Sequence, residues 1–140
     1  MAGAYGAYYY TYTAWDVLRP EDTPPGYTYL KHLRNFFGAT EFWTLEPSNE
    51  LVSVGHCLAN RGKEYVVFQN QAQAFSLKLE GLSGPAQARW FHPFTGEFLE
   101  AGTLANGTAQ LTPPDSWGTG PVALHVTAGR RAGTSTRTNR

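Results

Sequence analysis

The stretch Ala88-Arg89-Trp90-Phe91-His92-Pro93-Phe94-Thr95-Gly96-Glu97-Phe98 decides the fold. In an extended chain the side chains alternate between two faces, so Trp90 shares one face with Ala88 and Phe91 shares the other with Arg89. A tryptophan beside a phenylalanine carries a large apolar area, on the order of 150–250 Å² for each residue. We therefore predict that this strand is the packing centre of a small β-domain.

The same stretch contains its own turn. Proline has a fixed φ and no N–H for a sheet hydrogen bond, so Pro93 is expected to end the strand at His92. Residues 93–96 suit a type I turn, and His92 is expected to bond the backbone of that turn. Phe98 then begins the returning strand.

Short strands and turns continue on both sides of this stretch. Strands are expected over 51–59, 64–68, 75–79, 96–104, 108–111 and 121–126. The dipeptide Asn106-Gly107 favours a tight hairpin. This spacing predicts a mainly β fold, an antiparallel β-sandwich of about seven strands over residues 51–127. Its core is expected to contain Val67, Phe75, Leu77, Trp90, Leu124 and Val126.

One helix is predicted before the sandwich, over residues 25–37. Thr23 suits its N-cap, Pro25 its first position and Gly38 its C-terminal end. Its apolar residues recur at steps of three and four and form one stripe, made of Tyr29, Leu30, Leu33, Phe36 and Phe37. Such a stripe needs an apolar surface to pack against, because an isolated helix of this length is marginally stable.

A tyrosine-rich run over residues 4–14 precedes the helix. Tyrosines fall on both faces of this run, which is typical of a strand enclosed on both sides. Nothing else in the 140 residues is expected to enclose it. We therefore interpret it as a strand of a larger sheet.

The composition of the chain argues against two classes of partner, nucleic acids and membranes. The chain has 11 basic and 11 acidic residues, and four of the basic ones, Arg130, Arg131, Arg137 and Arg140, lie near the C-terminus. The remaining body is mildly acidic, so nucleic acid is not expected to bind it. No apolar run reaches the roughly 18 residues of a membrane span, so no membrane partner is expected. Residues 128–140 offer little to bury and are expected to be disordered.

Cysteine and histidine usage predicts neither a metal nor a cofactor. Cys57 is alone, so no internal disulfide can form, and its surroundings favour a small buried side chain over a reactive thiol. The four histidines, His32, His56, His92 and His125, lack the spacing of a metal site. No glycine-rich phosphate loop occurs.

The central turn and its flanks resemble a known family. Trp90-Phe91-His92-Pro93-Phe94-Thr95-Gly96 is similar to a turn motif in the C-terminal β-sandwiches of some glycoside hydrolases. The flanking motifs follow in the matching order: Trp15-Asp16-Val17, Pro24-Pro25-Gly26-Tyr27, Leu33-Arg34-Asn35-Phe36-Phe37 and the run from Trp43 to Pro47. Together they resemble the end of a TIM-barrel glycoside hydrolase of the apiosidase-like type with its appended collagen-binding-domain sandwich.

This resemblance covers nearly the whole chain and implies three parts. Residues 1–40 would be the last strand-helix unit of a barrel, 41–127 the sandwich and 128–140 the tail. The first residues lack the basic and apolar regions of a secretory signal. In a longer parent enzyme any such signal would lie upstream of Met1, so this start is compatible with a secreted parent.

Glycoside hydrolysis needs two carboxylates across a sugar, and none of the eleven acids has the surroundings of such a pair. The resemblance implies that earlier barrel strands supply them, so no catalytic residue is assigned here. Tyr12 and Trp15 are candidates for a sugar-stacking platform, or they pack in a core. Asp16 could bond a sugar hydroxyl, but capping the loop 17–23 or pairing with Arg19 is favoured.

Two functions follow from these residues. The first is a non-catalytic C-terminal part of a carbohydrate-active enzyme, whose sandwich braces the barrel through Phe36, Phe37, Phe42 and Trp43. The second is a stand-alone binding module for polysaccharide or collagen, with Trp117 as the aromatic residue expected to face solvent and Phe94 at the turn tip. One loop tryptophan is thin support, so bracing is preferred.

Overall fold

The computed structural model describes residues 25–129. The tyrosine-rich run 4–14, the candidate site residues Tyr12, Trp15 and Asp16, the N-cap Thr23 and residues 130–140 lie outside this range. The elements in chain order are α1 (Pro25–Gly38), η1 (Phe42–Thr44), β1 (Glu46–Pro47), η2 (Asn49–Leu51), β2 (His56–Asn60), β3 (Glu64–Gln69), β4 (Phe75–Leu79), β5 (Ala86–Phe91), β6 (Phe98–Leu104), β7 (Gly107–Leu111), η3 (Asp115–Trp117) and β8 (Val122–Ala128), where η marks a short 3₁₀ helix.

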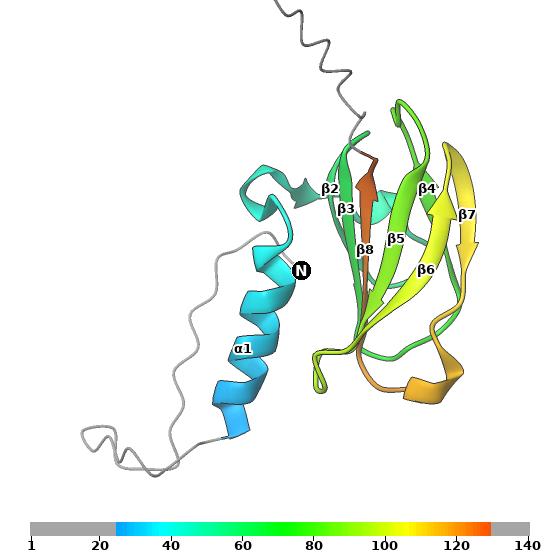
Figure 1. Cartoon of the computed structure of the whole chain (residues 1–140). Coiled ribbons are helices and arrows are strands. Elements are labelled where there is room, and N and C mark those ends of the chain that lie inside the picture. The colour runs from blue at the N-terminus through cyan, green and yellow to red at the C-terminus, as the bar shows by residue number, and fades with distance from the viewer. Residues whose placement is uncertain (1–24, 130–140) are drawn as a thin grey trace, which may run out of the picture.

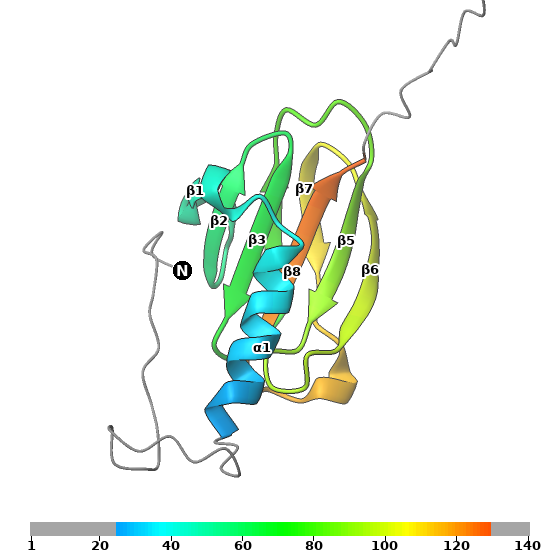
Figure 2. The same ribbon diagram turned by 60° about the vertical axis from the view of Figure 1, so that its left-hand side comes forward.

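The strands form two antiparallel sheets of unequal size. The larger sheet has the order β1-β2-β3-β8-β5-β6, and the smaller one pairs β4 with β7. In Figure 1 the smaller sheet lies on one face of the larger sheet and α1 lies on the other. Figure 2 shows α1 crossing in front of the middle of the larger sheet. The mainly β prediction is confirmed, and β2 to β8 account for the seven predicted strands.

The main core fills the space between the two sheets. All six predicted core residues belong to it, including Trp90, whose ring meets Phe75 edge-on at 6.1 Å between centroids. The alternation predicted for β5 is also confirmed, because Trp90 points into this core while Phe91 belongs to a second cluster on the outer face. β8 lies at the centre of the larger sheet, between β3 and β5.

Helix α1 forms where the sequence predicts it, and it covers the outer face. Its residue Phe36 is 3% exposed and packs with Phe91, Val66 and Ala123 of three neighbouring strands. The Phe36 and Phe91 rings are 4.7 Å apart between centroids. Within residues 25–129, no helix is long and apolar enough to cross a membrane.

The strand predicted over 51–59 begins later than expected, at His56. Gly55 has a φ of +96°, which interrupts the extended chain, and a side chain there would meet the carbonyl oxygen of Phe68. The side-chain oxygen of Asn49 accepts a hydrogen bond from the Cys57 N–H at 2.9 Å. The residues just before His56 therefore form a turn that leads into β2.

The hairpin predicted at Asn106-Gly107 is wrong. The strand before it, β6, pairs with β5 in the larger sheet, whereas β7 pairs with β4 in the smaller one. The Asn106 amide instead bonds both backbone groups of Leu82, at 2.9 Å to its N–H and 2.7 Å to its carbonyl oxygen. The dipeptide is a crossing between sheets that a side chain holds in place.

Two smaller boundaries also differ. The turn after β5 is wider than a four-residue type I turn, because the His92 carbonyl accepts from the N–H of Gly96 and the His92 N–H donates to Glu97. β5 ends at Phe91, one residue before the predicted end. Ala128, assigned above to the tail, is the last residue of β8, because its N–H donates to the Lys63 carbonyl.

We predict that Trp90→Ala lowers the free energy of unfolding by about 3–5 kcal/mol, since it leaves a cavity between the sheets. Chemical denaturation measures this change. Trp43→Ala is the matched control, because Trp43 is 63% exposed and its loss should change stability by no more than about 0.5 kcal/mol. Equal midpoints for the two variants would contradict the central place of Trp90.

Candidate functional site

The apolar stripe of α1 is longer than the surface it meets, and this leaves a candidate binding surface. Phe36, near the C-terminal end of the stripe, is buried. Leu33 and Tyr29, one and two turns earlier on the same face, remain 52% and 47% exposed, although the sequence predicts a stripe that packs along its whole length. The helix is therefore docked at Phe36 and open over its first turns.

A polar contact fixes the N-terminal half of α1 to the turn between β5 and β6. The His32 ring nitrogen Nδ1 lies 3.1 Å from the carbonyl oxygen of Pro93. Gly96, with a φ of +74°, passes so close that a Cβ there would lie 2.7 Å from the His32 ring. The turn needs glycine at this position because both the backbone conformation and the space exclude a side chain.

A buried acid-histidine pair fixes the segment that follows α1. Glu64 Oε1 lies 2.7 Å from His125 Nε2, and Glu64 Oε2 accepts a hydrogen bond from the Glu41 N–H at 2.9 Å. The His125 ring meets Phe36 edge-on at 5.9 Å. Burial lowers the pKa of His125, partly offset by its hydrogen bond to Glu64, and the charge of Arg89 lowers it further. We infer that the neutral imidazole donates to the carboxylate.

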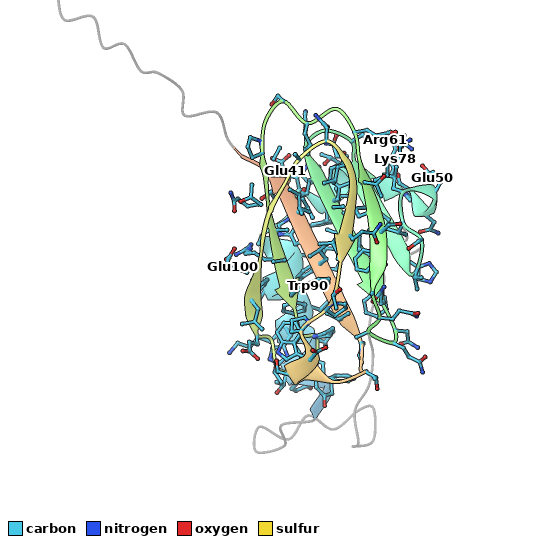
Figure 3. All side chains as sticks on the ribbon, turned by 90° about the vertical axis from the view of Figure 1, so that its right-hand side faces the viewer. Glu41, Glu50, Arg61, Lys78, Trp90 and Glu100 are labelled. Carbon is cyan, nitrogen blue, oxygen red and sulfur yellow. The ribbon has the colours of Figure 1, made fainter. Side chains whose placement is uncertain are left out.

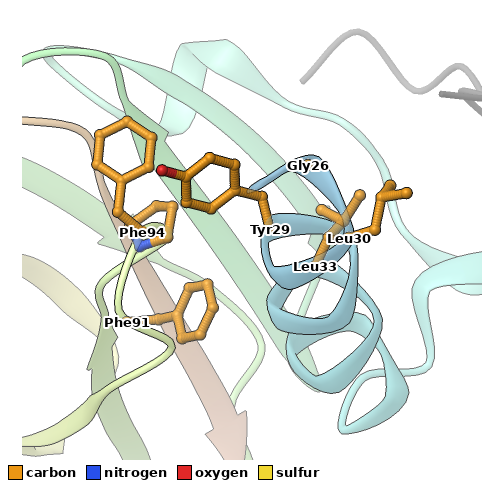
Figure 4. Close-up of a pocket in the computed structure, with 7 residues that line it drawn as sticks. Gly26, Tyr29, Leu30, Leu33, Phe91 and Phe94 are labelled. Carbon is orange, nitrogen blue, oxygen red and sulfur yellow. The ribbon is translucent and has the colours of Figure 1, made fainter. Parts of the chain in front are cut away.

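An apolar pocket opens between the first turns of α1 and the β5–β6 turn. Its volume is about 320 Å³, and it is lined by Gly26, Tyr29, Leu30, Leu33, Phe91, Pro93 and Phe94. The Tyr29 ring reaches toward Phe94 across its mouth (Figure 4), at 5.4 Å between centroids. Tyr29 and Phe94 are 47% and 53% exposed, so the pocket presents open aromatic surface.

A second apolar surface begins at the C-terminal end of α1. Phe37, Phe42 and Trp43 form a run of edge-on ring contacts, at 6.2 Å and 5.3 Å between centroids. We call these three residues the aromatic ridge. Trp43 is the most exposed large apolar side chain within residues 25–129. The expectation that Phe36 joins this surface is wrong, because Phe36 is buried under α1.

Trp117 is not the solvent-facing aromatic that the sequence predicts. It is half-buried at the end of η3, and its indole N–H donates to Glu97 at 3.2 Å. The His92 ring packs edge-on against it at 5.2 Å. As predicted, His92 also accepts hydrogen bonds from its own turn, from the N–H groups of Phe94 and Thr95. Trp117 thus stabilises the turn, which leaves Phe94 as the exposed aromatic there.

The charged groups of the described part of the chain do not gather into a metal-binding cluster. No group of three or more His, Cys, Asp or Glu side chains that could hold a metal ion occurs within residues 25–129. Arg61, Glu50, Glu80 and Lys78 form ion pairs at the surface. Figure 3 places this cluster at one end of the molecule, well away from Trp90. Cys57 is buried, and burial raises the pKa of its thiol to about 12, as expected for an inert side chain.

The sequence did not predict the contacts that hold α1. His32 and Pro93 are 61 residues apart in the chain, and so are Glu64 and His125. The sequence did contain one indication of such a contact. Glu64 stands at the start of the apolar strand β3, and a buried charge requires a partner. Its partner could not be chosen among four histidines without the strand order.

Residues 48–122, more than half of the chain, match the profile of the family described as "Putative collagen-binding domain of a collagenase". The chain belongs to this family. No curated protein matches the chain in sequence. The family match confirms the collagen-binding-domain part of the resemblance predicted from the turn motif, and it covers β2 to β7 and the start of β8.

Solved glycoside hydrolases contain the same fold. A structure titled "Glycoside hydrolase" has a TM-score of 0.64 and 19% identity, covering 76% of this chain and 26% of that one. A glycoside hydrolase family 5 structure from Bacteroides vulgatus ATCC 8482 has a TM-score of 0.64 and 18% identity, covering 77% and 25%. At these identities the similarity concerns the fold. This chain spans about a quarter of the length of each.

We predict that stability decreases as the pH falls below about 6.5. The folded state disfavours protonated His125, whereas the unfolded state takes up the proton at the ordinary pKa of about 6.5. The unfolded state therefore binds more protons in this range, and the free energy of unfolding falls with pH until the lowered pKa is passed. Urea denaturation between pH 5 and pH 8 measures this slope.

His125→Gln should flatten the slope, since glutamine can donate to Glu64 without titrating. His56→Gln is the matched control, because His56 is exposed at the start of β2, and it should leave the slope unchanged. A wild-type slope retained in His125→Gln would show that another group causes it.

Proposed function

We propose that the chain is a non-catalytic C-terminal part of a glycoside hydrolase, in which the β-sandwich braces the catalytic barrel. In this proposal residues 1–40 belong to the last strand-helix unit of the barrel, 41–127 form the sandwich and 128–140 a tail. The carbohydrate would be bound by the missing barrel. The observation that carries the proposal is the aromatic ridge, whose outermost residue Trp43 is exposed.

The ridge has the properties of one side of a domain interface. Exposed tryptophan is enriched where proteins bind partners, and a few such residues carry much of the binding energy. Its base is held in place, because the N–H of Glu41, just before Phe42, donates to Glu64, and Phe36, just before Phe37, anchors the helix. The ridge also begins in α1, at Phe37, and the proposal assigns this helix to the barrel. A covering domain would therefore contact helix and ridge together.

The partners of four acids support the non-catalytic part of the proposal. Hydrolysis requires two carboxylates facing one another across about 5–9.5 Å of open site. Glu64 is buried with His125, and Glu50 and Glu80 pair with Arg61. Glu97 accepts from Trp117. These acids have structural partners, and the apolar pocket is lined by no carboxylate.

The sharpest test uses the same substitution in two contexts: the chain alone, and the parent enzyme encoded by the reading frame extended upstream of Met1. In the chain alone Trp43→Asp should barely change stability. In the parent it should lower the melting temperature by about 4 °C or more, since a buried interface tryptophan contributes about 2 kcal/mol or more.

Thr108→Asp is the control, because Thr108 is exposed on β7, in the smaller sheet, which lies on the face of the larger sheet opposite α1. It should have little effect in either context. A Trp43→Asp parent as stable as wild type would contradict bracing through the ridge, as would the absence of an in-frame barrel upstream.

A stand-alone binding module for polysaccharide or collagen is the second candidate. The observation in its favour is the exposed pair Tyr29 and Phe94 at the pocket mouth. Aromatic-lined grooves bind proline-rich peptides, and aromatic faces also stack on sugars. The half-buried position of Trp117 weighs against it, since the aromatic residue predicted to face solvent is engaged within the domain.

If this second function holds, the purified chain is retained on insoluble polysaccharide or on fibrillar collagen. Phe94→Ala should then reduce retention at least tenfold, because it removes the exposed ring. Trp117→Ala tests the original candidate and should act only by loosening the turn. No retention on any matrix would exclude the binding module and leave bracing as the function.

A further inference from the structure

We propose that Asn106 is a site of spontaneous deamidation that the fold keeps closed, and that its conversion to aspartate or isoaspartate weakens the join between the two sheets. The inference goes beyond bracing, because it concerns a chemical modification of the sandwich itself and holds whether or not a barrel precedes it. Its basis is the sequence at the crossing from β6 to β7, the hydrogen bonds of Asn106 to Leu82 and the open space beside Gly107.

The dipeptide at the crossing has the sequence in which an asparagine is most open to attack by its own backbone. Asparagine is a thermolabile residue. In deamidation the backbone nitrogen of the next residue attacks the side-chain Cγ, and a glycine has no side chain to hinder the approach. Of the asparagines in the sequence, Asn106 alone precedes a glycine, while the others precede Phe, Glu, Arg or Gln. We therefore expect Asn106 to react first in the unfolded chain.

The reaction consumes water and needs no other reagent. The Gly107 nitrogen forms a bond to Asn106 Cγ as the bond from Cγ to Nδ2 breaks, and Nδ2 leaves as ammonia with the proton that the Gly107 nitrogen loses. Water then opens the five-membered imide at either carbonyl carbon, which gives aspartate or isoaspartate. Solvent reaches the site, because Asn106 is exposed and a Cβ on Gly107 would meet no other described residue within 4 Å.

The fold holds both reacting groups apart. Asn106 Oδ1 accepts from the Leu82 N–H at 2.9 Å, and Asn106 Nδ2 donates to the Leu82 carbonyl at 2.7 Å. Because both ends of the amide are bonded, Cγ cannot turn toward the Gly107 nitrogen until both bonds break. Leu82 is buried in the main core, and Gly107 pairs with Leu79 in the smaller sheet. The reaction in the folded protein therefore requires a local opening of the crossing.

Conversion destroys the contact that protects the site. An aspartate has no N–H for the Leu82 carbonyl, which would then face a negatively charged oxygen. Isoaspartate also adds one carbon to the main chain at the point where it passes from β6 to β7. These two strands belong to different sheets, so either product weakens the join between them.

Peptide mapping by mass spectrometry tests the protection in the full chain. The chain is kept at mildly alkaline pH, folded in one sample and unfolded in guanidinium in the other, and the Asn106 peptide is followed with time. Deamidation should be at least about tenfold slower in the folded sample, because it requires an opening. Equal rates would overturn the protection by the fold, and an Asn106 that stays intact in the unfolded chain would overturn the site itself.

Two variants test whether Leu82 provides the protection. Leu82→Ala leaves the Asn106-Gly107 sequence unchanged but removes the side chain that anchors the Leu82 backbone in the main core. It should raise the folded-state rate several-fold. Phe36→Ala is the matched control, since Phe36 is also buried but lies on the outer face of the larger sheet, and it should have a much smaller effect. Equal rates in the two variants would contradict protection by Leu82.

The consequence of the modification is tested with its aspartate product. Asn106→Asp should lower the melting temperature of the chain by about 4 °C or more, since it leaves the Leu82 carbonyl without its donor. Asn70→Asp makes the same change at an exposed position after β3 and should leave the melting temperature as in wild type. An Asn106→Asp variant as stable as Asn70→Asp would overturn the claim that conversion weakens the join, and would not affect the ridge test.

Discussion

The alternation of β5 is the constraint on which the rest of the structure depends. Trp90 points between the sheets, so Phe91, the next residue, must point to the outer face of the larger sheet. An exposed cluster of Phe91, Val66 and Ala123 would be costly in water, at about 25 cal/mol for each Å² of apolar surface. Phe36 covers that cluster. The helix is therefore required by the sheet, whatever else it contacts.

The pair formed by Glu64 and His125 helps to fix the position of α1 on the sheet. Apolar packing alone would allow α1 to slide, but the Glu64 carboxylate accepts from the Glu41 N–H just after the helix, and His32 meets the Pro93 carbonyl near its other end. These two polar contacts fix how α1 lies on the sheet. They thereby set both the pocket beside the β5–β6 turn and the ridge at Trp43.

Local patterns predicted the elements well, because they depend on neighbouring residues. The spacing of Phe75, Leu77 and Leu79 gave β4, and the steps from Tyr29 to Phe37 gave α1. Contacts between residues far apart in the chain could not be predicted from such patterns. The side chain of Asn106 bonds Leu82, 24 residues away, and turns a hairpin sequence into a crossing between sheets. The burial of Trp117 depends likewise on Glu97 and His92, which its own loop does not reveal.

Hydrogen exchange in α1 tests most directly whether the helix is an integral part of the sandwich. The measurement compares wild type with Phe36→Ala and with Phe37→Ala, a half-buried neighbour on the ridge side of the helix. The account predicts that Phe36→Ala removes most protection from residues 26–37 and preserves that of β3 and β8, while Phe37→Ala has a smaller effect. Protection of α1 that survives Phe36→Ala would contradict the account, because the helix would then be held by contacts other than the outer-face cluster.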